Sequence, residues 1–281
     1  MTRYRTSVLV SLVVTGVMVG ANALAARQTP PPTQQPPPTA GGAVAGQQAP
    51  PAGGRQGRAG GPPSMGGGQC ANNPYNCPDA VNPLPAPDTV WLEEMTWMDV
   101  RDAMKAGKTT VIIATGGFEP NGPWLALGKH NYVLKANCDA IARKLGDALC
   151  APVVAFVPEG NHEPKSGHMT TVGTISLRED TYNALLSDIV MSMKQHGFEH
   201  IIMIGDSGGN GRGMTAVADK YTKEWGGTPV VAHVPEHYTY SIATKFAVDK
   251  GLFPAERKSD GLHDDPTITL NMFVTDPNSV R

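Results

Sequence analysis

The first 78 residues of this 281-residue chain contain no aspartate or glutamate, and the first carboxylate is Asp79. From residue 26 to about residue 87 the chain is dominated instead by Pro, Gly, Gln and Ala. A segment of this composition cannot bury enough apolar surface to offset the entropy of ordering it. The sequence therefore predicts a disordered, partly extended tether over 26–87 and a folded domain over 88–281.

Long hydrophobic runs are also lacking. The apolar run from Ser7 to Gly20 is too short to span a bilayer comfortably. It is preceded by Arg3 and Arg5 and followed by a stretch of small residues at 23–25. This pattern is typical of a secretory signal peptide, so we expect residues 1–25 to be removed on export to the periplasm or medium. An uncleaved N-terminal anchor is the alternative. The final "VTDPNSVR" shows no clear helix cap and leaves open that the domain continues beyond it.

The chain has no excess of positive charge. Of 23 Lys and Arg residues, removal of Arg3 and Arg5 leaves 21 against 25 Asp and Glu, a net charge near −4. This balance provides no electrostatic footprint for nucleic acid or for an anionic membrane. We therefore expect a small molecule rather than a nucleic acid as the partner, and no membrane span in the mature chain.

Cysteine is scarce, with four residues in all. Cys70 and Cys77 flank the turn-like "ANNPYN", and in an oxidising compartment they are the predicted disulfide. Cys138 and Cys150 are harder to join, since twelve residues of one straight helix rise about 18 Å, whereas a disulfide needs Cα atoms within about 7 Å. This second pair stays unassigned, and Cys138 is interpreted as a small buried apolar residue.

The folded part alternates between two hydrophobic periods. Continuous β-branched runs, typical of strands covered on both faces, occur at 111–115, 153–157, 201–205 and 230–234. Helical patterns lie between them, at 134–145 and 182–193, and Ser176 with Glu179 resembles a capping box before the second helix. The alternation predicts an α/β fold: a mostly parallel sheet in a three-layer α/β/α arrangement.

Polar, Gly-rich loops follow all four expected strands, and they hold most of the histidines. They read "GGFEPNGPWLALGKHN", "PEGNHEPKSGHMTTVGT", "GDSGGN" and "PEHYTY". In parallel sheets ligands bind outside the carboxyl ends of the strands. We therefore expect these loops to meet at one edge and to form a pocket.

Ser207 lies in "IGDSGGN", which matches both the trypsin-like Asp-Ser-Gly-Gly and the nucleophile-elbow Gly-x-Ser-x-Gly patterns. The trypsin-like reading needs two all-β barrels and an upstream His and Asp where this chain shows helical patterns. The elbow reading fits better, because Ser207 precedes a helix expected near Asn210, and Asp260 and His263 could complete a triad. No oxyanion motif accompanies it, so a serine hydrolase using Ser207 with His263 is kept as the alternative.

Three of these segments resemble the creatininase (creatinine amidohydrolase) family. "GGFEPNGPWLALGKH" is similar to its Gly-Ser-x-Glu-Gln-His-Gly-Pro-His-Leu-Pro-Leu-Gly-Thr-Asp segment. "HMTTVGTISL" and "GFEHIIMIGDSGGN" resemble its His-x-x-Phe-Pro-Gly-Thr-Ile-Ser-Leu and Asn-Gly-His-Gly-Gly-Asn segments, and "GLHDDPTIT" is a weaker match to a late His-Ala-Gly segment. The resemblance runs in order from about residue 111 to the end.

The resemblance implies an α/β/α domain, usually a homo-oligomer, with two divalent ions, zinc or manganese, that activate water to cleave a C–N bond of a small amide. Glu119 matches a ligand of that family. Asn121 stands where the family has a ligand His, His130 where it has the bridging Asp, and Ser207 where it has another His. An imidazole normally binds one cation rather than two. We therefore expect a remodelled site with one metal, or with none.

The sequence thus predicts a hydrolase of a small amide, lactam or related C–N compound; a non-catalytic periplasmic small-ligand-binding protein is a further alternative. His263 with Asp264 and Asp265 is interpreted either as a general base with its orienting acid or as an extra group of ligands. Asp264 and Asp265 could equally cap the helix that follows them. The expected site residues are Glu119, His130 and Asp206 for metal, with His168 as another candidate ligand; His263, Ser207 and His168 for catalysis; and Asn121, Trp124 and Asn210 for substrate binding.

Overall fold

The computed structural model describes residues 81–254, 256 and 263–281. The expected signal peptide, most of the expected tether and the Cys70–Cys77 pair lie outside these residues. The described part of the tether, 81–87, contains no helix or strand. Across the described ranges, no helix combines the length and the apolar character needed to cross a bilayer.

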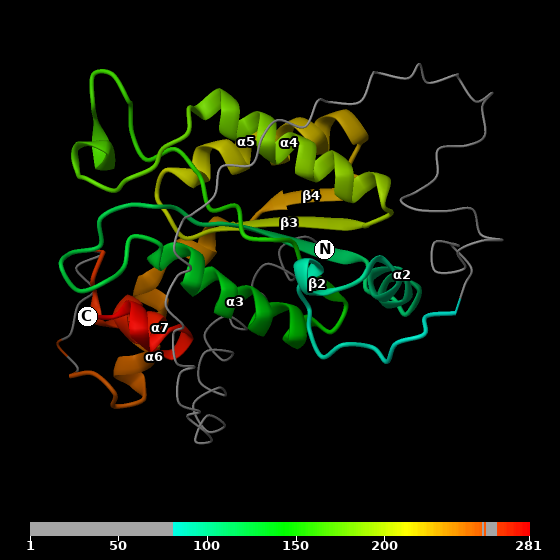
Figure 1. Ribbon diagram of the computed structural model, residues 1–281, viewed down its shortest axis with the longest axis horizontal. Coiled ribbons are helices and arrows are strands. Elements are labelled where there is room, and N and C mark those ends of the chain that lie inside the picture. The colour runs from blue at the N-terminus through cyan, green and yellow to red at the C-terminus, as the bar shows by residue number, and fades with distance from the viewer. Residues whose placement is uncertain (1–80, 255, 257–262) are drawn as a thin grey trace, which may run out of the picture. The chain divides into compact units, whose positions relative to one another are not determined.

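Four parallel strands form one sheet in the order β2-β1-β3-β4 (Figure 1). The central strand β1 is buried along its whole length, as its continuous β-branched run predicts. The order places β1 and β3 side by side in the middle of the sheet, so the loops that follow them are neighbours. The strands are β1 (Thr110–Thr115), β2 (Ala148–Cys150), β3 (His200–Gly205) and β4 (Val230–His233).

Helices cover both faces of the sheet, which confirms the three-layer α/β/α fold. In Figure 1, α4 (Glu179–Gln195) and α5 (Asn210–Trp225) lie over one face, and α3 (Lys129–Leu145) lies under the other. Helix α7 (Pro266–Thr275) packs against α3. The remaining helices are α2 (Trp97–Lys105) and α6 (Tyr240–Asp249), with 3₁₀ turns η3 (Leu92–Glu94), η4 (Gly167–Thr170), η5 (Pro235–Tyr238) and η6 (Pro277–Ser279).

Two apolar cores follow from the alternation of side chains along β1. Val111 and Ile113 point into the core shared with α4 and α5, whereas Ile112 and Ala114 point into the core shared with α3. Because both faces are packed, the strand ends are held in place from two sides. This fixes the positions from which the loops of the site begin.

The strand expected at 153–157 is wrong. The second strand of the sheet is β2, a few residues earlier, and the expected segment makes only isolated bridges, at Val154 and Val157. The ladder shifts by one residue here, because the Ala151 amide bonds to the Ile112 carbonyl and the next amide to bond to β1 is that of Val154, to the Ala114 carbonyl. Val154 still bonds to the backbone of β1, so the chain continues along the sheet edge toward the loop that carries Glu159.

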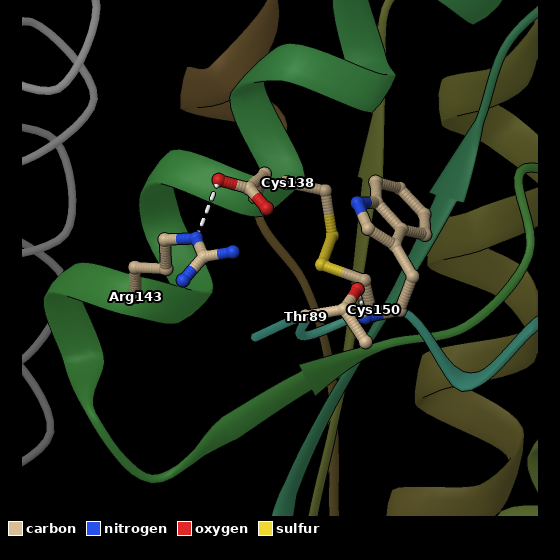
Figure 2. Close-up of a disulfide and its surroundings, with 6 residues drawn as sticks. Thr89, Cys138, Arg143 and Cys150 are labelled. Carbon is tan, nitrogen blue, oxygen red and sulfur yellow. Dashed lines mark hydrogen bonds and ion pairs between the residues drawn. A yellow bond between two sulfur atoms is a disulfide. The ribbon is translucent and has the colours of Figure 1, made fainter. Parts of the chain in front are cut away.

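Cys138 and Cys150 form a disulfide, with their Cα atoms 6.2 Å apart (Figure 2). The interpretation of Cys138 as an unpaired apolar residue is wrong, because no single straight helix joins the two cysteines. Instead, α3 ends at Leu145, and Gly146 adopts a left-handed conformation with φ of 81°. The chain therefore turns back, and β2 brings Cys150 beneath the middle of α3.

Two helix caps were expected from the sequence, and one is present. Asp265 caps α7 by accepting a hydrogen bond from the Thr267 amide, which confirms the cap interpretation of this residue. The capping box at Ser176 is wrong, because α4 has no side-chain cap. The Ser176 hydroxyl accepts from the Glu159 amide at 2.9 Å and donates to the Gly160 carbonyl at 2.7 Å, so it shapes the Glu159 loop instead.

Candidate metal centre

Segments far apart in the sequence meet around Glu119, in the loop after β1. His130 lies in the first turn of α3, His168 lies between β2 and α4, and His263 precedes α7. The nearest approaches are Nε2 of His130 to Oε1 at 2.5 Å, Nδ1 of His263 to Oε1 at 3.2 Å, and Nδ1 of His168 in close contact with Oε2. The Glu119 carboxylate is only 3% exposed, so three imidazoles surround a buried anion.

His130 lies between two carboxylates. Its Nε2 faces Glu119, and its Nδ1 lies 2.7 Å from Oδ2 of Asp206, which follows β3. Burial opposes a charged ring, but the hydrogen bonds with Asp206 and Glu119 outweigh it, and the pKa of His130 is raised. For Asp206, burial likewise opposes ionisation, but the His130 hydrogen bond prevails and its pKa is lowered. The Tyr240 hydroxyl donates to the other oxygen of Asp206.

Glu159 is a second buried carboxyl group beside Glu119. Its Oε2 lies 3.2 Å from Nδ1 of His168, and its Oε1 accepts from the Ser207 hydroxyl at 3.3 Å. Burial, together with the neighbouring Glu119, raises the pKa of Glu159 to about 9. Burial also opposes the charge of Glu119, but the bond with His130 lowers its pKa to about 2. Two adjacent carboxyls cannot both ionise cheaply, so Glu119 carries the charge and Glu159 the proton.

Lys129 is the first residue of α3 and is 1% exposed. Burial lowers the pKa of this lysine, whereas the charges of Asp206 and Glu119 act to raise it. Within the described part of the chain, its ammonium makes no hydrogen bond or ion pair. An unpaired cation is thus held inside the domain beside the carboxylate cluster.

A divalent cation fits at Glu119, His168 and His263, whose ligand atoms lie within 4.8 Å of one another. Oε2 of Glu119 is buried and has no hydrogen-bond donor among the described residues, because His168 contacts it in a geometry that is not a hydrogen bond. Nδ1 of His263 donates to the Pro120 carbonyl at 2.5 Å, which leaves Nε2 free, the usual arrangement for a ligating histidine. Imidazole with carboxylate suits zinc or manganese.

The three residues expected to bind substrate have different surroundings. The Asn121 amide nitrogen bonds to the Glu119 carbonyl at 2.8 Å, and the Asn210 amide nitrogen bonds to the Thr115 and Gly116 carbonyls at 2.8 Å. Both side chains therefore hold loops together, each with its Oδ1 buried and unpaired in the described residues. Trp124 is largely exposed.

The expected metal set of Glu119, His130 and Asp206 does come together, but both nitrogens of His130 already face carboxylates. His168 and His263 are the imidazoles beside the unpaired oxygen of Glu119, and their rings pack edge to face. Each is about one-third exposed, so this side of the cluster is open to solvent.

Ser207 is brought to the same cluster through Glu159, as the strand-end argument predicts. Its hydroxyl donates to the carboxyl of Glu159, whereas His263 donates to the Pro120 carbonyl and lies 3.2 Å from Oε1 of Glu119. A serine nucleophile needs a base that receives its proton. The group that Ser207 contacts here is a carboxyl that itself holds a proton.

Sequence reasoning missed Glu159, Lys129 and Tyr240. Glu159 lies two residues after the apolar run at 153–157, so its position after an expected strand was the available signal. No pattern in the sequence marks Lys129 as buried, because its burial results from tertiary packing. Tyr240 reaches Asp206 from α6, a contact that no local pattern encodes.

Comparisons with known proteins identify the family of this chain. The family model described as creatinine amidohydrolase matches residues 93–281. A creatinine amidohydrolase of Pseudomonas putida is 22% identical over 116 residues, which are 41% of this chain and 44% of that protein, so the alignment spans less than half of the relative.

Solved structures of creatininase share the fold. One crystal structure of creatininase has a TM-score of 0.58 at 21% identity and covers 69% of this chain and 75% of that one. A structure described as "Creatininase Mn" has a TM-score of 0.56 at 20% identity over 69% and 76% of the two chains. A mutant creatininase of Zn-Zn type has a TM-score of 0.55 at 18% identity over the same shares. Since the matched family model covers most of the chain, with this sheet and this carboxylate-imidazole cluster inside it, the chain belongs to the creatininase family.

Proposed function

We propose that this chain hydrolyses a small amide, lactam or related C–N compound, and that it does so with one divalent cation, zinc or manganese, held by Glu119, His168 and His263. The observation that carries the proposal is the convergence of two partly exposed imidazoles on a buried carboxylate whose Oε2 lacks a hydrogen-bond donor among the described residues. Relatives described as manganese and zinc forms of creatininase support the choice of metals.

When bound, such a cation supplies Lewis acidity toward a carbonyl oxygen and lowers the pKa of water. Glu159 holds a proton at neutral pH beside this position, so it can donate that proton to the nitrogen that leaves. The Ser207 hydroxyl and the Ser176-shaped loop orient the Glu159 carboxyl. His130 and Asp206 fix Glu119 through its other oxygen.

Elemental analysis of protein purified without chelator tests this proposal. We expect about one equivalent of metal per chain, lost in Glu119→Ala and in His168→Ala but kept in His196→Ala, an exposed histidine at the end of α4. Metal retained in both site variants would contradict the ligand assignment.

Liquid chromatography with mass spectrometry, on a panel of lactams and linear amides that includes creatinine, tests the reaction. Saturable binding without turnover would favour a ligand-binding protein instead.

We further propose that the mature domain works outside the cytoplasm, as residues 1–25 predict. The Cys138–Cys150 disulfide supports this, because disulfides persist in oxidising compartments. A homo-oligomer is the partner state implied by the family. Leu270, Phe273 and Val274, at i, i+3 and i+4 on α7, form an exposed apolar face that a second copy could cover.

A further inference from the structure

Three carboxyl groups from three different loops lie buried in one cluster: Glu119, Glu159 and Asp206. Burying a carboxylate is costly unless positive charge lies nearby. We propose that Lys129 and His130 supply the positive charge that a second metal ion would bring, so that the site takes up one divalent cation and excludes another. This inference rests on the proposed metal site.

The placement of Lys129 is unusual for a structural lysine. It is the first residue of α3, where the helix dipole disfavours positive charge, and the first turn contains no acidic residue to offset it. It is buried, and its ammonium is unpaired within the described residues. The charges that act to keep it positive include those of Asp206, Glu119 and Asp264. The lysine therefore serves the carboxylate cluster as a whole rather than one partner.

His130 is the next residue and acts by direct contact. Its two ring nitrogens each lie within 2.7 Å of a carboxylate oxygen, one from Asp206 and one from Glu119. A carboxylate oxygen accepts hydrogen bonds and donates none, so both nitrogens carry hydrogens and the ring is an imidazolium. It thus bridges two anionic groups, as a metal ion would, and it fills the space between them.

The charge balance favours a single ion. Glu159 is neutral, so the ionised carboxylates of Glu119 and Asp206 and the two protein cations give −2 + 2 = 0 for this cluster. One divalent cation brings the sum to +2, and a second would bring it to +4 within a buried site. Repulsion between like charges at short range in a protein interior is large enough to prevent the second binding step.

Calorimetric titration with Mn²⁺ of the chelator-treated full-length protein tests this. We expect one equivalent in the wild type and roughly tenfold or more tighter binding in Lys129→Met, which removes a nearby positive charge at similar side-chain length. The double variant Lys129→Met/His130→Gln should take up a second equivalent. Lys135→Met is the matched control, because Lys135 lies on the same helix but is half exposed and pairs with Glu93. The Lys135→Met variant should bind Mn²⁺ with the same affinity as the wild type.

Two equivalents in the wild type would overturn the inference, as would equal Mn²⁺ affinities in Lys129→Met and Lys135→Met. Uptake of only one equivalent by a folded double variant would also overturn it. If the double variant does not fold, the comparison of the two single variants decides. No uptake by any of the proteins would contradict the proposed metal site and this inference with it, whereas normal uptake without a charge effect would contradict this inference alone.

Discussion

Reduction of the Cys138–Cys150 disulfide should lower the free energy of unfolding by about 3 kcal/mol. The bond joins residues 12 apart in sequence. Closing a loop of this length removes about 10 cal/mol/K of entropy from the unfolded chain, which is about 3 kcal/mol at 25 °C. Both sulfur atoms are buried in the core between α3 and the sheet, so solvent does not relieve the change in the folded state.

The assay is urea unfolding followed by circular dichroism, in a Cys70→Ser/Cys77→Ser background so that only this disulfide responds to reductant. With a slope of about 2 kcal/mol/M, the midpoint should fall by about 1.5 M on reduction. A Cys138→Ala/Cys150→Ala variant in the same background should be insensitive to reductant. An unchanged midpoint, with mass spectrometry showing both thiols alkylated after reduction, would refute the reasoning.

Three other outcomes follow from the site and the surface. In metal-free protein, Glu159→Gln should become more stable relative to wild type as the pH rises from about 5 to 9. The reason is that the pKa of Glu159 is raised to about 9 in the folded wild type, so its contribution to wild-type stability is present below pH 4.5 and is lost as the pH approaches 9. Equal pH profiles of the two proteins in thermal melts would argue against a buried protonated carboxyl. A serine-reactive phosphonate should leave Ser207 unlabelled, since its hydroxyl faces Glu159, and stoichiometric labelling would revive the serine-hydrolase alternative. Phe273→Glu, on the exposed face of α7, should shift light-scattering mass toward the monomer, and an unchanged mass would place any oligomer contact elsewhere.

The sheet was predictable where the sequence pattern was continuous. β1, β3 and β4 are runs rich in β-branched residues, and the structure confirms each of them to within about one residue. β2 is only three residues long, and its position is fixed by pairing with β1 rather than by its own sequence. The longer apolar run after it drew the prediction to 153–157, where only Val154 and Val157 form isolated bridges.

The site was predictable as a place but not as a set of contacts. The rule that loops meet at the carboxyl edge of a parallel sheet brought Glu119, His168 and Ser207 to one cluster, as the structure shows. Family position suggested His130 as a ligand, whereas its pairing with Asp206 depends on the distance between α3 and β3. The burial of Lys129 and the raised pKa of Glu159 come from tertiary packing, which one sequence does not reveal.

X-ray absorption spectroscopy of the metal-loaded protein, at the zinc or manganese edge, tests the central claim most directly. The account predicts a single cation with two imidazole ligands and carboxylate oxygen, and loss of the imidazole signal in His168→Ala/His263→Ala. A second metal in the scattering at about 3.5–4 Å, the separation of two-metal sites, would contradict it, as would a coordination shell without imidazole.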